Sequence, residues 1–121
     1  MSLAFSSALQ IAARIRQREL SALEALDYFK QRVEGLNARI NAIVVFDWER
    51  AYHSARAADA ALAAGAIPGP LHGVPITVKE SFDVAGLPTT RGEPVRCRTS
   101  VFGSYVALSA YAARSPVFCG S

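Results

Sequence analysis

The chain has 121 residues, of which 51% are hydrophobic and 19% are charged. This is the composition of a soluble globular domain and excludes disordered and collagen-like chains. The longest apolar runs, such as residues 43–46, are far shorter than the ~20 residues of a membrane-spanning helix. No cationic region precedes an apolar run at the N-terminus. We therefore expect no membrane association and a cytoplasmic location.

The formal net charge of +3 does not indicate nucleic-acid binding. Basic and acidic side chains are equal in number over residues 1–93, and the excess comes from Arg96, Arg98 and Arg114. Three scattered arginines do not form the basic stripe that binds phosphates. Cys97 and Cys119 lack a CxxC pair or a histidine at zinc-ligand spacing, so we expect reduced thiols and no metal site.

The first half of the chain predicts helices around one strand. Apolar side chains recur at helical spacing over residues 7–18, which indicates an amphipathic helix. Ser21 and Glu24 form a capping box that begins a second helix. Its apolar side chains recur at steps of three and four, and the stop signals are at residues 35–37.

A strand and a third helix are expected next. Residues 40–46 are short and β-branched, which favours a strand, and Asp47 is placed to cap the following helix. The alanine-rich stretch 51–64 predicts that helix, with Gly65 as the residue after its end. Its small side chains would allow close packing on a neighbouring element.

The sequence changes character at residue 66, where Gly and Pro begin to separate short extended runs. Val74, Ile76 and Val78 alternate onto one face of a predicted strand, and Thr77 and Lys79 fall on the other. Lys79 thus ends a strand, which is where α/β proteins tend to assemble ligand sites.

This region carries a resemblance to a known family. The run GPLHGVPITVKE at residues 69–80, followed by FDVAGLPTT at residues 82–90, resembles the N-terminal part of amidase-signature enzymes. The preceding elements fit as well, so the resemblance spans residues 7–92. It implies an α/β fold in which helices pack on a mixed sheet, of which this chain would be a truncated N-terminal portion.

The resemblance also implies a chemistry, namely hydrolysis of a small-molecule amide or transfer of the amide nitrogen, by a Ser, cis-Ser, Lys triad in which Lys79 matches the lysine. A neutral lysine accepts a proton through one serine while the other serine attacks the carbonyl. Loss of water around a lysine favours its neutral form. Glu80 is expected on the opposite face of the strand. The triad needs no cofactor and no metal.

Other interpretations of these residues stay open. A lysine at a strand end is ordinarily solvated. His72 lies in a predicted turn without an orienting partner, so we expect a structural role. Thr89 and Thr90 are expected to shape a loop, with the substrate entrance as the alternative.

The catalytic serines of the family have no counterpart here. Ser104 and Ser121 each follow one glycine, without the flanking glycines of an oxyanion hole. We therefore divide the chain into an amidase-like segment, residues 1–93, and an atypical tail, residues 94–121. The tail suggests that the reading frame is lost near Pro94 or that the chain is a truncated relic.

Two functional hypotheses follow. In the first, the chain is an amidase segment that supplies Lys79 and is inactive alone because the serines are absent. In the alternative, it is a non-enzymatic truncated fragment or a small partner-binding α/β module. Uncovered helix faces and strand edges would then favour self-association. A third interpretation, a glutaminase-like component that amidates charged transfer RNA, finds little support in the thin basic tail.

Overall fold

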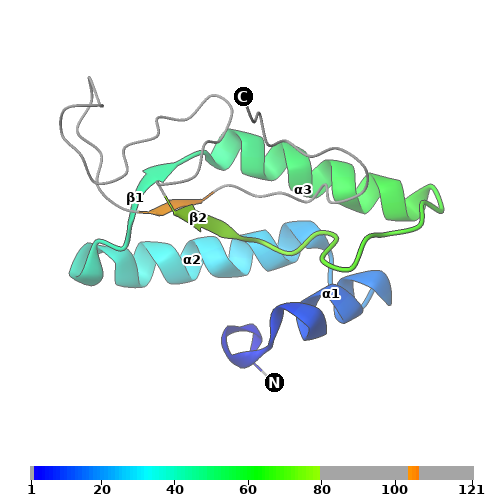
Figure 1. Cartoon of the computed structure of the whole chain (residues 1–121), viewed down its shortest axis with the longest axis horizontal. Coiled ribbons are helices and arrows are strands. Elements are labelled where there is room, and N and C mark those ends of the chain that lie inside the picture. Colours follow the sequence, from blue (N-terminus) through cyan, green and yellow to red (C-terminus); the bar gives the residue numbers. More distant parts are fainter. Residues whose placement is uncertain (1, 80–103, 107–121) are drawn as a thin grey trace.

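The computed structural model describes residues 2–79 and 104–106 (Figure 1). Its elements are η1 (Leu3–Phe5), α1 (Ala8–Arg16), α2 (Ala22–Ile40), β1 (Ile43–Phe46), α3 (Trp48–Ala63), β2 (Thr77–Lys79) and β3 (Ser104–Val106). Helices α2 and α3 lie side by side and run antiparallel, and α1 lies beside the start of α2 (Figure 1). In the described part of the chain, every helix is too short or too polar to span a lipid bilayer.

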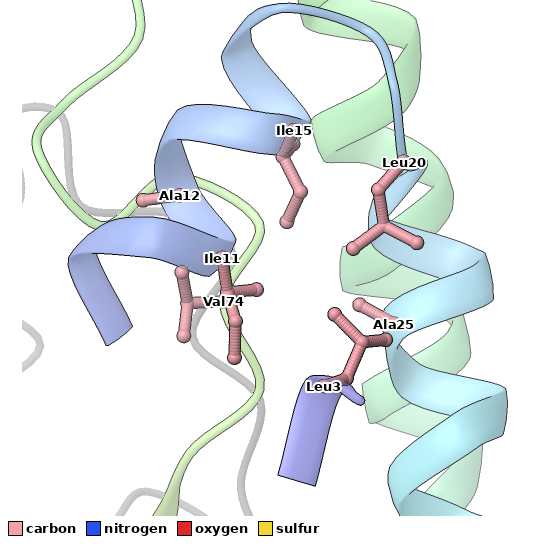
Figure 2. Packing of buried hydrophobic residues seen from close by; sticks show 7 residues of the cluster. All are labelled: Leu3, Ile11, Ala12, Ile15, Leu20, Ala25 and Val74. Atoms are coloured by element: carbon pink, nitrogen blue, oxygen red, sulfur yellow. The ribbon is translucent and has the colours of Figure 1, made fainter. Parts of the chain in front are cut away.

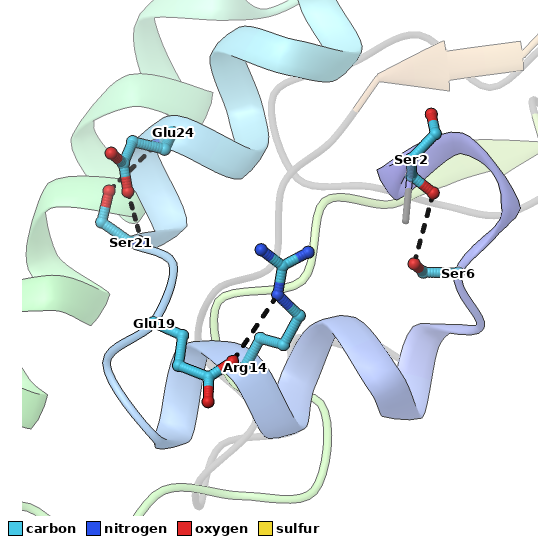
Figure 3. A network of polar contacts seen from close by, with 6 residues as sticks. All are labelled: Ser2, Ser6, Arg14, Glu19, Ser21 and Glu24. Atoms are coloured by element: carbon cyan, nitrogen blue, oxygen red, sulfur yellow. Dashed lines mark hydrogen bonds and ion pairs between the residues drawn. The ribbon is translucent and has the colours of Figure 1, made fainter.

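The predicted helix starts are confirmed, because each helix is capped by its own sequence. The Ser7 hydroxyl accepts from the Gln10 backbone N–H, and the Gln10 side chain accepts from the Ser7 backbone. Ser21 and Glu24 make the same reciprocal pair at the start of α2 (Figure 3). Asp47 caps α3 by accepting from the Arg50 N–H at 3.2 Å. These side chains satisfy donors that a helix leaves free at its start.

The predicted end of the second helix is wrong, because α2 continues through Gly35 and Asn37 to Ile40. Asn41 ends it in the left-handed conformation, with φ of 46°. The Asn37 side chain does not stop the helix. It donates to the Ile43 carbonyl at 2.7 Å and accepts from the Ile43 N–H at 2.9 Å, so it ties the helix to β1. The strand therefore begins at Ile43 and not at Ile40.

Buried apolar side chains form two clusters. The first joins α1, the start of α2 and the segment before β2 (Figure 2), and consists of Leu3, Ile11, Ala12, Ile15, Leu20, Ala25 and Val74. The second lies between α2 and α3, and consists of Ala22, Leu26, Ala51, Ala55 and Ala58. Ala51, Ala55 and Ala58 are at most 3% exposed, which confirms that the small side chains of α3 permit close packing.

Asp59 of α3 joins the same two helices by a polar contact. One carboxylate oxygen accepts from the Ala22 N–H at 2.7 Å, and the other accepts from the Leu23 N–H at 3.2 Å. Hydrogen bonds to a charged group are among the stronger ones in proteins. The start of α2 is therefore capped both by Ser21 and by a carboxylate from a neighbouring helix.

The described residues are mostly helical, with short strands that pair in the order β1, β3, β2. The β1 and β3 strands are parallel, and β2 and β3 are antiparallel. The strand predicted to include Val74 and Ile76 is limited to residues 77–79. Val74 instead closes a turn, since its N–H donates to the Leu71 carbonyl at 3.2 Å.

Candidate active site

Lys79 occupies the last position of β2 and is exposed. Thr77 is exposed on the same face, whereas Val78 is partly buried on the other. The alternation predicted for these three residues is confirmed. Within residues 2–79, no acidic side chain forms an ion pair with Lys79. Among the described residues, the Lys79 side chain is therefore exposed and has no ion-pair partner.

The strand register gives Lys79 a neighbour to which sequence reasoning assigned no role. Its Cα partner across the antiparallel β2 and β3 pair is Ser104. In the sequence, Ser104 stands out only because it follows a glycine. A Gly-Ser pair does not predict which distant strand will lie beside it. Glu80, Thr89 and Thr90 lie outside the described residues, as does Ser121.

His72 lies in the turn before β2, as predicted, and is 9% exposed. Its Nε2 is 2.9 Å from the Ala58 carbonyl oxygen of α3, and its backbone N–H donates to the Gly69 carbonyl at 3.2 Å. Gly73 follows with φ of 75°, a left-handed conformation that glycine adopts at little cost. The turn is thus fixed by its own backbone and by a helix.

Two depressions in the described surface are lined by other residues. The first, about 200 Å³, is almost wholly apolar and is formed by the C-terminal half of α2 with β1; its lining includes Phe29, Val33, Leu36, Ile40 and Ile43. The second, about 260 Å³, lies where α1, α2 and α3 meet. In the described part of the chain, no three metal-ligating side chains lie close enough together to hold a metal ion.

Polar contacts elsewhere shift two pKa values. A hydrogen bond from the Tyr52 hydroxyl to the Asp27 carboxylate raises the pKa of Tyr52 above its ordinary value. Hydrogen bonds from Ser21, first from its backbone and then from its side chain, lower the pKa of Glu24. Both groups lie in contacts that hold helices, so we assign them structural roles.

Comparison with known proteins identifies the class. A family model described as Amidase matches residues 24–99, which is more than half of the chain and includes β2 with Lys79. The chain belongs to the amidase family.

Individual relatives extend this result. The chain is 43% identical to an indoleacetamide hydrolase of Bradyrhizobium diazoefficiens over 73% of its own length and 17% of that protein. It is 41% identical to an amidase of Pseudomonas putida over 70% of its length and 18% of the relative. It is 37% identical to an acylamidase of Rhodococcus erythropolis over 94% of its own length and 24% of that protein. The chain spans about a fifth of the length of these relatives.

Proposed function

We propose that the chain is the N-terminal part of an amidase-type α/β fold and supplies Lys79 as the base for hydrolysis of a small-molecule amide. The observation that carries this proposal is the position of Lys79, exposed at the end of β2 inside the matched region. We assign residues 1–93 to the amidase segment and residues 94–121 to an atypical tail. The helices of the segment would cover a mixed sheet whose further strands come from other residues.

The proposed proton path needs two serines besides Lys79. The nucleophilic serine attacks the amide carbonyl and passes its proton to the bridging cis-serine, which passes its own proton to the neutral Lys79 Nζ. The tetrahedral intermediate collapses as that proton returns through the bridging serine to the leaving nitrogen. Water then attacks the acyl-serine along the same path, and the carboxylic acid leaves. Every proton removed is returned, so no cofactor takes part.

The exposure of Lys79 determines what must complete the site. A protonated lysine cannot accept a proton, and contact with water favours the protonated form. The residues that carry the serines would therefore also cover the open face of β2. Because this chain offers no Gly/Ser-rich serine motif, we propose that it is inactive alone. The alternative function for an inactive chain is to bind a partner through the exposed apolar face of α2, where Leu36 is 40% and Ile40 is 67% exposed.

The experiment is to incubate the purified 121-residue chain with a panel of aryl, aliphatic and amino-acid amides and to follow ammonia release. The indoleacetamide hydrolase of B. diazoefficiens serves as the positive control. We expect no release from the chain and release from the control. If the chain released ammonia and Lys79→Ala abolished the release, the proposed inactivity would be overturned. If Ser104→Ala abolished it too, the missing serine would be Ser104, the register partner of Lys79.

A further inference from the structure

His72 is the buried titratable group that the proposed mechanism does not use. Within the described ranges it is the one charged or polar side chain that is buried. Its Nε2 faces the Ala58 carbonyl oxygen at 2.9 Å. A carbonyl oxygen only accepts, so Nε2 must carry the proton and donate it. Buried polar groups generally have such partners, and losing one is costly.

The two residues that follow His72 are fixed by other parts of the fold. A Cβ at Gly73 would lie 3.0 Å from the Ala22 Cβ and 3.1 Å from the Ile15 Cγ2, so the backbone here touches α1 and α2 directly. Val74 is 3% exposed in the first apolar cluster. Three consecutive residues thus contact all three helices: His72 contacts α3, Gly73 contacts α1 and α2, and Val74 enters the core.

Only Pro75 and Ile76 separate this anchor from β2. The proline ring fixes φ near −65°, and five residues of extended chain span at most about 18 Å. A change in the position of the turn therefore passes to Lys79 along a short and stiff connection. The pairing of β2 with β3 supports the strand from the side and links it to α2 indirectly, through β1 and Asn37.

We propose that His72 is a positioning residue: its hydrogen bond to Ala58 holds the turn on α3 and so sets the place of β2 and of Lys79. As far as it concerns Lys79, this inference rests on the proposed function. His72 does not itself touch the reacting atoms. It acts through the short connection that ends in the lysine.

The test uses nuclear magnetic resonance on the whole 121-residue chain, without substrate. In the wild type we expect the His72 ring to be protonated at Nε2, with a proton that exchanges slowly. We expect His72→Leu, which fills the space but cannot donate, to speed amide exchange at residues 77–79 by roughly fivefold to tenfold and to move the Lys79 side-chain signals. His72→Gln, whose terminal NH₂ can reach the same carbonyl, should restore both. His53→Leu removes an exposed histidine from α3 and is the matched control.

Each outcome decides the proposal. Protonation at Nδ1 only, or fast exchange of the Nε2 proton in the wild type, would overturn it even if the leucine variant failed to fold. So would a folded His72→Leu variant with unchanged β2 exchange and Lys79 signals. Because these signals are read without turnover, they are independent of amide hydrolysis. A failure of the proposed function would leave them unchanged.

Discussion

Replacement of Gly73 by alanine tests the packing that places the turn before β2. Gly73 has φ of 75°, where the Cβ of an L-residue is strained. The added Cβ would also lie 3.0 Å from the Ala22 Cβ and 3.1 Å from the Ile15 Cγ2. Ala22 and Ile15 are each 1% exposed, so neither has solvent-facing space into which it can retreat. The substitution therefore combines backbone strain with overpacking.

The expected magnitude is the sum of two effects. A left-handed conformation costs an L-residue about 1–2 kcal/mol, and one methyl group forced into a packed interior costs about 1–3 kcal/mol. Gly73→Ala should therefore lower the free energy of unfolding by roughly 2–5 kcal/mol. The control is Gly35→Ala, in the interior of α2, where a new Cβ meets nothing within 4 Å. That change should raise the free energy of unfolding by about 0.5–1 kcal/mol, because alanine is the better helix former.

The assay is urea denaturation followed by far-ultraviolet circular dichroism. The midpoints of both variants are compared with that of the wild type, provided that the free energy of unfolding depends on urea with the same slope in all three. The two alanines should move the midpoint in opposite directions. If Gly73→Ala unfolded at the midpoint of the wild type, or if both variants shifted alike, the close approach of the turn to α1 and α2 would be refuted.

Two further predictions concern contacts between helices. Asp59→Ala should lower the free energy of unfolding by about 2–4 kcal/mol in the same assay, because it leaves the Ala22 and Leu23 N–H groups without their charged acceptor. Asp59→Asn keeps an acceptor oxygen and should lower the free energy less. Equal losses in the two variants would contradict the role of the charge. The pKa of Tyr52 is raised chiefly by its hydrogen bond to Asp27, so phenolate absorbance should show it titrating above the ordinary value of 10.0. The stabilisation that the Tyr52 hydroxyl gives through this hydrogen bond is present below pH 10 and is lost as the pH rises through the pKa of Tyr52 in the folded protein. In Asp27→Asn the titration should move down, and an unchanged curve would count against the contact.

Local signals in the sequence predicted much of the helical structure. Ser21 with Glu24, and Asp47, each satisfy free helix donors within four residues, so the starts of α2 and α3 can be read from a short stretch. Gly65 ends α3 at φ of 82° for the same local reason. The end of α2 was missed because Asn37 uses its side chain on Ile43, a contact that a helix-stop rule does not represent.

The site depends more on tertiary contacts, and less of it could be predicted. The position of Lys79 at the end of β2, with Thr77 on the same face, follows from alternation and is confirmed. The contact of His72 with Ala58, and the capping of α2 by Asp59, join residues 14 and 37 positions apart. Pairing of Lys79 with Ser104 likewise joins separate strands. No periodicity within one element encodes such contacts.

The role of Lys79 is tested most directly by a chimera in which residues 24–99 of this chain replace the aligned segment of the B. diazoefficiens indoleacetamide hydrolase, assayed for release of ammonia from indoleacetamide. We predict that the chimera is active and that Lys79→Ala lowers kcat by on the order of 10²–10⁴-fold, the range of general acid–base catalysis. Lys30→Ala, which removes the only other lysine of the chain, should leave kcat nearly unchanged. An active chimera that keeps its kcat in Lys79→Ala would contradict the assignment of Lys79 as the base.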